Sequence, residues 1–546
     1  MKDVLIIGSG ISGMSSAVHC AERGIRVTLI SPYPSERSQS VMAAGGINAV
    51  TYTDGEDSIS SHIEDTLKGG ARLGGINAVT GLCSHAGEII DYLENIGTVF
   101  SIDEKGRPSK RAFGGQSHNR THYCGTSTGK QIVSALVMET RRYEAEGLIT
   151  RRLRTHFHSA LISDGVCHGV LVYDEQTNSL VPYYADAVIM AVGGQNSLFG
   201  KTTGSMLCDG YAVGRLFMQG AVLKNLEFIQ YHPTTLETAQ KKVLISEAVR
   251  GEGGRLFYLE NNKRVYFMED KYGPKGNLMT RDIVSREIYN TGREVFLDIS
   301  FLDKKLIDTR LPEVRDLCLK YRNIDISKQP IPVVPSVHFF MGGLAVHLNH
   351  ETSIRGLYAV GECASMYHGA NRLGGNSLLA AVYSGSVAAE AIAGAEDLRQ
   401  NRGAADFDGY IEEERGKFKK LLESESIFPV MYVRDMLADI MNKNLGIVRT
   451  EEELKKGIED IDEYLTMTSR LNYDASVSAY TNYSLNGIMT LARAVMTCAE
   501  FRKESRGAHY RSDHPEQLDD YACATLITYD GGSFHTEQDK GSAYEY

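Results

Sequence analysis

The stretch from Gly361 to Leu379, GECASMYHGANRLGGNSLL, decides the fold of this chain. It follows an apolar run at 356–360 that predicts a buried strand, and it leads into a small-residue helix expected over 378–394. A glycine-rich turn between a strand and a helix is where an α/β sheet presents backbone amides to an anionic ligand. The turn also contains polar side chains, namely Glu362, His368, Asn371 and Arg372. We expect it either to hold a cofactor and a substrate together or to be an ordinary solvated turn.

A second glycine-rich turn, GSGISG at 8–13, stands near the start of the chain. A buried strand is expected before it at 4–7, a helix begins in it, and a second strand is expected at 26–30. This context makes the pattern a dinucleotide-binding fingerprint, because its glycines let the backbone approach a pyrophosphate at the helix N-terminus. The glycines concerned are Gly8, Gly10 and Gly13.

Three further features bear on the cofactor. Ser31 stands where an acidic residue usually holds the ribose, so we expect Glu362 to take that part. Residues 35–50 are small and glycine-rich, and they either pass close to a flat ring system or form a surface loop. Asp209 stands at the start of a predicted helix and either caps it or holds a cofactor hydroxyl.

Composition limits the class of protein. The 546 residues are 42% hydrophobic and 23% charged, which is typical of a soluble globular protein with two to four domains. The net charge of −11 argues against nucleic acid as the main partner, so any anion site must be built locally from a few arginines. The nine cysteines form no CxxC pair, which argues against a zinc ribbon or an iron–sulfur cluster carried by this chain.

The dispersed cysteines suit a reducing cytoplasm. The chain begins directly in a predicted strand, and it contains no uncharged run long enough to span a bilayer. We therefore expect no signal peptide and a cytoplasmic location.

The pattern along the chain predicts its domains. Strands and helices alternate up to about residue 228 and return after 345, whereas residues 229–344 break this rhythm and predict an inserted domain. Residues from about 405 to 510 are charged and helical in period, which predicts a helical bundle. The tail beyond Tyr510 has little periodicity, and we expect it to be a lid, a partner contact or partly disordered.

Seven segments, in the same order, resemble the flavoprotein subunits of succinate dehydrogenase and fumarate reductase, a family that includes L-aspartate oxidase. The match extends over nearly the whole chain. The segments are GSGISG at 8–13, EFIQYHPT at 227–234, SEAVRGEGGRLF at 246–257, TRD at 280–282, VHFFMGG at 337–343, GLYAVGE with HGANRLGGNSLL at 356–379, and RKESRGAHYR at 502–511.

The resemblance implies an α/β fold in which a Rossmann-like FAD-binding domain, residues 1–228 and 345–400, is interrupted by an α+β capping domain at 229–344. A helical domain at 401–510 and a tail at 511–546 follow. FAD is the implied cofactor. The residues expected to contact FAD are Gly8, Gly10, Gly13, Ser31, Gln39, Ser40, Ala44, Gly45, Gly46, Ala191, Asp209, Glu362, Arg372, Ser377 and Leu378.

The family's substrate is a dicarboxylate held between the flavin and the capping domain. By position, Arg372, His338 and His232 would hold its carboxylates, and charge-assisted bonds of this kind contribute about 1.5–3 kcal/mol each. Ser246, Gly46 and the turn at Phe113 would complete the substrate pocket.

In the family, reduction of fumarate transfers hydride from flavin N5 to one alkene carbon while an arginine protonates the other. Arg281 matches that arginine, and Glu247 and Arg250 match the relay that resupplies its proton. An arginine ordinarily keeps its proton, so this role requires concerted resupply through Glu247. The alternative is that Arg281 only binds a carboxylate.

The most informative departure from the family is Gln39. Members that oxidise succinate usually tether FAD to a histidine in an R-S-H-[ST] stretch, and this chain has Arg-Ser-Gln-Ser at 37–40. Glutamine cannot form that bond, so we expect noncovalent FAD and a bias toward fumarate reduction.

Two other functions stay open. L-aspartate oxidase also binds FAD noncovalently, but it has a glutamate for the substrate ammonium where this chain has Phe113, and a buried ammonium without a partner costs several kcal/mol. A noncatalytic FAD-binding electron-transfer subunit would not need Glu247, Arg250 and Arg281. No second nucleotide fingerprint is evident, so a separate iron–sulfur subunit is the expected electron partner, and any membrane contact would be made through partners.

Overall fold

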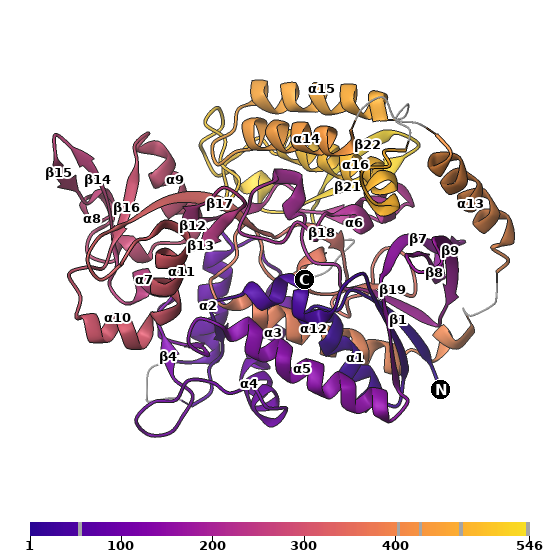
Figure 1. Ribbon diagram of the computed structural model, residues 1–546, viewed down its shortest axis with the longest axis horizontal. Helices are drawn as coiled ribbons and strands as arrows, with labels where there is room; N and C mark the ends of the chain where they lie inside the picture. Colours follow the sequence, from indigo (N-terminus) through magenta and orange to yellow (C-terminus); the bar gives the residue numbers. More distant parts are fainter. Residues whose placement is uncertain (53–56, 401–404, 425–428, 469–472, 542–546) are drawn as a thin grey trace.

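The computed structural model describes residues 1–546 except 53–56, 401–404, 425–428, 469–472 and 542–546. An α/β body carries a lobe on one side, at the left of Figure 1, and a layer of helices above it.

The body is built on a parallel sheet in the order β19-β10-β1-β2-β6. Its strands are β1 (Asp3–Ile7), β2 (Arg26–Ser31), β6 (Ile149–Leu153), β10 (Ala187–Met190) and β19 (Leu357–Ala359). Val4 is in register with Val27 on one side and with Ala187 on the other. The three inner strands are nearly continuous apolar runs, because helices and loops cover both faces of such a sheet.

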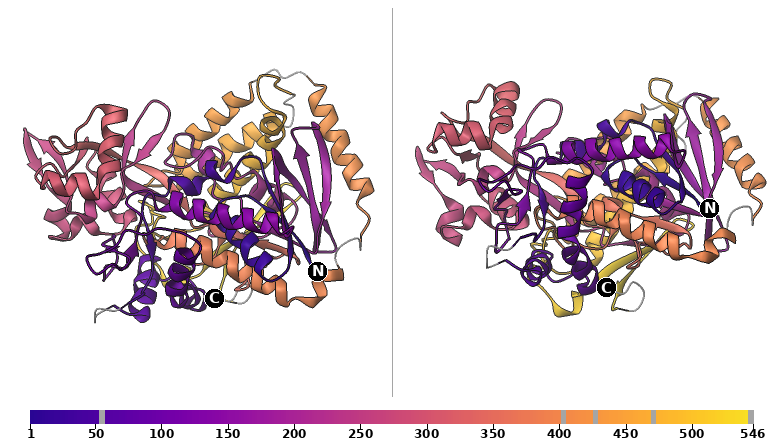
Figure 2. Two further views of the ribbon diagram at one scale, coloured as in Figure 1. Left: turned by 60° about the horizontal axis from the view of Figure 1, so that its bottom comes forward. Right: turned by 90° about the horizontal axis from the view of Figure 1, so that it is seen from below.

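Helices α1 (Ile11–Glu22), α5 (Thr128–Ala145) and α12 (Asn376–Gly394) pack together beside this sheet (Figure 2). Ser15 of α1 donates a 2.8 Å hydrogen bond to the carbonyl of Val382 in α12, and the small residues of both helices allow this close approach. Among the described helices, α12 alone has the length and mean hydropathy of a membrane span. Its packing against α1 identifies it as a core helix.

The segment between β2 and α5 forms α2 (Ile59–Gly69), α3 (Ile76–Ser84) and α4 (Ala86–Asn95). It also contains a small sheet of three two-residue strands, ordered β3-β5-β4. These strands are β3 (Ile47–Asn48), β4 (Lys110–Arg111) and β5 (Thr121–His122).

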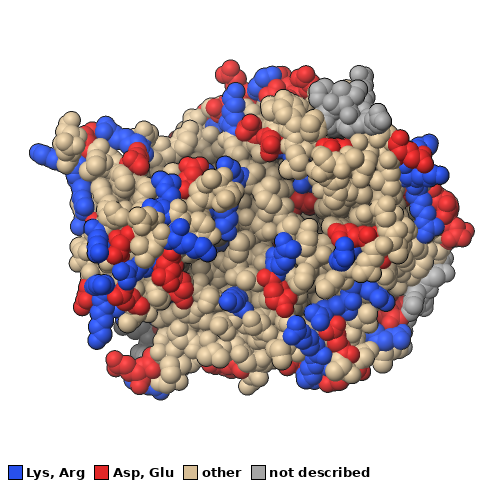
Figure 3. All heavy atoms as spheres, in the orientation of Figure 1, with Lys and Arg blue, Asp and Glu red and all other residues tan. Residues whose placement is uncertain are grey.

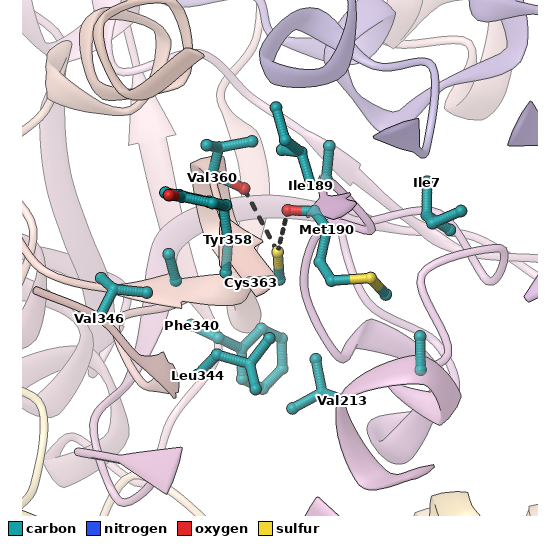
Figure 4. Packing of buried hydrophobic residues seen from close by; sticks show 14 of the residues in the cluster. Ile7, Ile189, Met190, Val213, Phe340, Leu344, Val346, Tyr358, Val360 and Cys363 are labelled. Atoms are coloured by element: carbon teal, nitrogen blue, oxygen red, sulfur yellow. Dashed lines mark hydrogen bonds between the residues drawn. The ribbon is translucent and has the colours of Figure 1, made fainter. Parts of the chain in front are cut away.

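The C-terminal ends of β10 and β19 and the strand β18 (Gly343–Ala345) lie around the buried thiol of Cys363. Its Sγ donates to the carbonyl oxygens of Met190 and Val360, each at 3.3 Å, and apolar side chains such as Phe340 and Leu344 surround it (Figure 4). This cluster anchors the strand that precedes the Gly361 turn.

Three antiparallel strands, β7 (Thr155–Ser163), β8 (Val166–Asp174) and β9 (Ser179–Tyr184), are inserted between β6 and β10 as a separate sheet. Helix α13 (Asp408–Leu422) lies on its outer side (Figure 1). Helix α6 (Tyr211–Met218) and β11 (Leu223–Lys224) follow β10.

The lobe has its own sheet, ordered β13-β12-β17-β16-β14-β15, and its own apolar core. The strands are β12 (Ile229–Glu237), β13 (Lys242–Leu244), β14 (Arg255–Glu260), β15 (Lys263–Val265), β16 (Val295–Asp298) and β17 (Ile331–Phe340). The helices are α7 (Ala248–Gly251), α8 (Phe267–Tyr272), α9 (Arg281–Asn290), α10 (Lys304–Arg310) and α11 (Pro312–Arg322). We propose that residues 229–344 act as a capping domain.

Three further helices, α14 (Val430–Asn444), α15 (Glu451–Thr468) and α16 (Ala479–Phe501), cover the top of the body in Figure 1. The segment beyond Tyr510, for which the sequence showed little periodicity, contains two strands within its described residues. Strands β21 (Ala524–Asp530) and β22 (Ser533–Asp539) form a hairpin that pairs with β11. They complete a mixed sheet ordered β20-β18-β11-β21-β22, in which β20 is Ala364–Ser365.

A fully buried ion cluster joins this hairpin to the body. Arg502 donates to Glu227 at 2.6 Å and to Glu504 at 2.9 Å, and it also donates to Thr525 of β21 at 2.9 Å. Arg506 donates to the same Glu504 at 2.7 Å. Each charge in the cluster therefore has a partner, which offsets the cost of removing it from water.

The change Arg502→Ala should destabilise this junction by about 3–5 kcal/mol, because it leaves Glu227 buried without its partner. We expect a lower thermal midpoint and earlier chymotrypsin cleavage within β21 and β22. Lys503→Ala is the matched control, since Lys503 is half-exposed and lies 3.7 Å or more from its acidic neighbours. Equal midpoints for the two variants would contradict a stabilising role for the cluster.

Candidate functional site

A cavity lies where the two glycine-rich turns of the body face the lobe. It encloses roughly 1500 Å³ of empty space, including its opening to solvent. The structure brings most of the expected residues together in its wall. These are Gly8, Gly10, Ser31, Gln39, Ser40, Ala44, Gly45, Gly46, Phe113, Ala191, His232, Ser246, Glu247, Arg281, His338, Glu362, Arg372, Ser377 and Leu378.

The first glycine turn joins β1 to α1. Gly8 has φ +109°, and a Cβ there would lie 2.2 Å from the carbonyl oxygen of Ala191. Only glycine allows the turn to pack so closely on β10, and the N-terminus of α1 then opens toward the cavity. Gly13 lies behind the wall, in contact with Gly8 and Ala191.

The small-residue segment after β2 forms the adjoining wall. Ser40 accepts a 3.2 Å hydrogen bond from the amide of Ile11, and Gln39 accepts one from the amide of Ser205. The Arg111 guanidinium donates to the carbonyl oxygens of Ala44 and Gly45. These bonds hold the backbone of 39–45 in place against the cavity.

The second glycine turn leads into α12. Gly375 has φ +87°, and a Cβ there would lie 2.0 Å from the Asn48 side chain. Asn48 donates 2.7 Å hydrogen bonds to the Gly374 carbonyl and to Asn376 Oδ1. These two bonds of Asn48 therefore hold the turn in place. Ser377 and Leu378 line the cavity at the N-terminus of α12.

Glu362 lies in the wall between the two turns. It accepts a 3.1 Å hydrogen bond from the amide of Phe340. Burial raises the pKa of its carboxyl to about 7, against the opposing effects of that amide and of Arg372. A buried carboxyl of this kind accepts or donates a hydrogen bond to a ligand hydroxyl, as the ribose of a dinucleotide requires.

Arg372 occupies the end of the cavity nearest the lobe. The residue is 3% exposed, and its guanidinium lies 4.3 Å from the centre of the Phe339 ring. Within the part of the chain that the structure describes, its guanidinium has no hydrogen-bond acceptor, and Nε is a buried donor without a partner. Burial and the nearby Arg281 lower the pKa of Arg372 well below its ordinary value. An anion in the cavity would supply the missing acceptors.

Two histidines face each other beside Arg372. The rings of His232 and His338 are 5.1 Å apart, at 64° to one another. Burial lowers the pKa of both well below the ordinary value, and the charge of Arg281 adds to the effect. Both rings are therefore neutral near pH 7.

Glu247 lies among arginines of the lobe. Arg281 donates to its Oε2 from Nη2 at 2.7 Å and from Nε at 2.9 Å. Arg250 lies 3.5 Å from Oε1, behind the cavity wall, and the amide of Gly114 donates to Oε1 at 2.7 Å. Burial alone would raise the pKa of Glu247, but Arg281 and Arg250 hold it below its ordinary value. The carboxylate is therefore ionised.

Gln230 of β12 links Arg281 of the lobe to the Arg372 backbone of the body. Its Oε1 accepts from Arg281 at 3.1 Å, and its Nε2 donates to the Arg372 carbonyl at 2.7 Å and to Asn371 at 2.8 Å. Asn371 in turn donates to Asp282 at 3.0 Å. The fully used amide of Gln230 fixes the position of both arginines.

The charges at this end do not balance. Arg250, Arg281 and Arg372 are buried cations, Glu247 is the ionised carboxylate among them, and Glu362, with a pKa of about 7, offsets the charge of Arg372 only in part. Elsewhere acidic and basic side chains are interspersed over the surface in Figure 3. This end of the cavity therefore has an excess of positive charge and favours an anionic ligand.

Asp209 is placed differently from its expected role at the cofactor. It lies outside the cavity wall, where it accepts hydrogen bonds from the Tyr211 amide at 3.0 Å and the Tyr480 hydroxyl at 2.8 Å. This contact is close to the capping alternative, although the N-cap position itself is Gly210. The physical reason is that Asp209 stands just before α6, where its short side chain reaches the amide of the first helical residue.

The sequence did not single out several residues of the site. They are Gln230, Gly114, Thr203, Phe339, Arg111 and Asn48. Gly114 acts through its backbone amide, which a sequence motif does not reveal, and the other five act through their side chains. Gln230 and Phe339 stand inside the motifs at 227–234 and 337–343, and Asn48 and Arg111 lie beside glycine-rich segments.

Comparisons with known proteins agree with this geometry. Residues 3–378 match the family model described as "FAD binding domain", and residues 434–541 match "Fumarate reductase flavoprotein C-term". The succinate dehydrogenase flavoprotein subunit of Bacillus subtilis is 36% identical over 540 residues, which covers 95% of this chain and 92% of that protein. The CoM/CoB fumarate reductase of Methanothermobacter marburgensis has a subunit that is 32% identical over 544 residues, covering 96% of each chain.

Among solved structures, a quinol-fumarate reductase with menaquinol molecules matches with a TM-score of 0.90 and 29% identity, covering 100% of this chain and 99% of that one. The FrdA chain of E. coli quinol fumarate reductase, in a mutant form, matches with a TM-score of 0.88 and 29% identity, covering 98% and 96%.

Gly8→Ala should reduce the FAD retained by the purified protein by about tenfold, because a Cβ at φ +109° meets the Ala191 carbonyl and strain of this kind costs about 1–3 kcal/mol. The flavin-to-protein absorbance ratio measures the effect. Gly24→Ala is the control, with φ +69° and no atom within 4 Å of its Cβ. Full flavin content in Gly8→Ala would show that the turn does not depend on this contact.

Proposed function

The chain belongs to the family of succinate dehydrogenase and fumarate reductase flavoprotein subunits, and from this premise we propose that it catalyses the interconversion of fumarate and succinate, with a bias toward reduction of fumarate. It is an FAD-dependent oxidoreductase.

The partnerless guanidinium of Arg372 carries this proposal. A buried guanidinium without acceptors is unfavourable unless a ligand supplies them, and a carboxylate matches its fork of donors. The excess of positive charge around it favours a dicarboxylate dianion. Arg372 would bind one carboxylate, and His232, His338 and Ser246 would contact the substrate from the lobe side.

FAD would lie along the wall formed by the two glycine turns, Gln39 to Gly46 and Glu362, and it supplies the hydride when bound. The large apolar ring of Phe113 backs the junction between this wall and the substrate end, where it contacts Gly45. Closure of the lobe over the body would exclude water and strengthen each polar contact inside.

Arg281 would donate the proton that completes reduction. Its guanidinium donates hydrogen bonds to Glu247 and Gln230, which fix its position. The residue still lines the cavity. Because Glu247 is ionised at rest, it cannot store the proton. It would pass a proton from Arg250 to Arg281 as Arg281 gives up its own.

Aspartate oxidation is a weaker candidate. Its substrate carries an ammonium, which would need an anionic partner beside the bound dicarboxylate. Phe113 offers none, and Glu247 is already paired with two arginines. The repulsion between an ammonium and the net positive charge of the site acts in the same direction.

Electrons would come from a separate iron–sulfur subunit. The matched relatives are named as subunits, and the names of two of them include different molecules, 8-methylmenaquinol in one and CoM/CoB in the other. Among the described residues, eight of the nine cysteines are buried and none forms a disulfide. Any contact with a membrane would be made through partners.

Arg281→Ala should lower the rate of fumarate reduction by reduced viologen at least about 10²-fold, because a general acid contributes about 10²–10⁴-fold. The assay is anaerobic, with purified FAD-loaded protein. Arg286→Ala is the control, because Arg286 lies on the same helix but stacks on Tyr510, at 4.6 Å, outside the cavity.

Two results would count against the proposal. One is an Arg281→Ala rate equal to that of the control. The other is L-aspartate-dependent peroxide formation under air, which would assign the protein to aspartate oxidation.

A separate experiment tests whether FAD is attached noncovalently and which direction of the reaction is faster. Acid precipitation should release all the yellow colour into the supernatant, because Gln39 cannot form the covalent bond. In the same preparation, fumarate reduction should be faster than succinate oxidation. A yellow pellet, or faster succinate oxidation, would contradict the role assigned to Gln39.

A further inference from the structure

The turn at 202–205 follows η3 (Asn196–Phe199) and forms part of the cavity wall next to His338. Thr202 accepts the amide of Gly204 at 3.0 Å and donates to Asn196 at 3.3 Å. The amide of Ser205 donates to Gln39. Asn196 and Gln39 therefore hold the two ends of the turn, so its position does not depend on His232 or His338.

Thr203, the central residue of the turn, contacts His338 directly. Its Oγ1 lies 2.8 Å from His338 Nδ1 and 3.2 Å from the Val337 carbonyl, and the residue is 7% exposed. The Val337 carbonyl already accepts the Thr203 amide at 3.3 Å. The Thr203 oxygen thus lies closer to the ring nitrogen than to the Val337 carbonyl, and the carbonyl has another donor, so the hydroxyl can donate to the ring.

The protonation of His338 gives this contact its importance. Burial and the charges of Arg281, His232 and Arg372 lower the pKa of His338 well below its ordinary value, so the neutral ring carries one N–H. Within the described residues, Nε2 has no hydrogen-bond partner, although the residue lines the cavity. A bound carboxylate only accepts hydrogen bonds, so Nε2 can contact it favourably only as a donor.

We propose that Thr203 is a positioning residue for the substrate: its hydroxyl donates to His338 Nδ1 and thereby keeps the ring proton on Nε2, where it serves the dicarboxylate. This inference rests on the proposed function for its substrate, but the position of the ring proton is a property of the protein alone.

The opposite tautomer would work against binding. If Nδ1 donated to Thr203, the lone pair of Nε2 would face the carboxylate. The bond from Thr203 also polarises the ring and strengthens the Nε2 donor. One hydroxyl in the cavity wall would in this way determine whether a neutral histidine attracts or repels the ligand.

The test uses FAD-loaded protein and the variants Thr203→Val, Thr203→Ser and Thr202→Val. Valine keeps the shape of threonine without its hydroxyl, and serine restores the hydroxyl. Thr202→Val removes a hydroxyl from the same turn that does not contact His338. Dissociation of malonate, a nonreacting dicarboxylate, is followed by the flavin absorbance change, and KM and kcat are measured for fumarate.

Thr203→Val should raise the malonate Kd and the fumarate KM by about fivefold, the effect of one hydrogen bond, with kcat changed less than about twofold. Thr203→Ser should bind like the wild type. Thr202→Val should lower the thermal midpoint without raising the malonate Kd. A rise of equal size in Thr202→Val would overturn the proposal, because the effect would then come from the turn's structure.

The ring proton is measured separately, by ¹⁵N NMR of histidine-labelled protein without dicarboxylate, with the His338 signals assigned by their loss in His338→Gln. We expect a protonated Nε2 and an unprotonated Nδ1 in the wild type. A proton on Nδ1 would overturn the proposal. If the wild type bound no malonate and reduced no fumarate, the proposed function would fail while this measurement would still decide the tautomer.

Discussion

The carboxylate of Glu247 holds the substrate end of the cavity together. Arg281, Arg250 and the Gly114 amide all converge on its two oxygens. Burying three guanidinium groups in one place is unfavourable, and a single buried anion offsets only part of their repulsion. The remaining imbalance makes the empty site unfavourable and a dianionic ligand favourable, so the same charges that limit stability produce affinity.

Some of the contacts at this end cross between the lobe and the body. Gly114 belongs to the body and Glu247 to the lobe, and Gln230 of β12 contacts both Arg281 of the lobe and the Arg372 carbonyl of the body. The geometry of the site therefore depends on how the lobe is seated. A displacement of the lobe would separate Glu247 from Gly114 before it altered the fold of either part.

The sequence was sufficient to predict the architecture and much of the site. The apolar run at 4–7, the glycines after it and the expected second strand are local features, and β1, α1 and β2 follow from them. The side chains of Arg372, His338 and Arg281 stand in segments that resemble a known family. Contacts made by backbone atoms were beyond reach, as the Gly114 amide illustrates. Asp209 illustrates a different limit, because one short acidic residue suits a helix cap as well as a ligand. The hairpin of β21 and β22 was missed because its pairing with β11 joins residues about 300 positions apart, and local periodicity carries no information on such pairing.

The mixed sheet behind the Gly361 turn also constrains how the protein is made. Its strands come from residues 223–224, 343–345, 364–365 and 524–539, so β11 pairs with an element about 300 residues later in the chain. During translation this edge of β11 stays unpaired until residues 524–530 have been synthesised. The cluster of Glu227, Arg502 and Thr525 is likewise completed only at that stage. A product truncated before residue 502 would therefore expose both the unpaired edge of β11 and the unpartnered Glu227, and features of this kind promote aggregation.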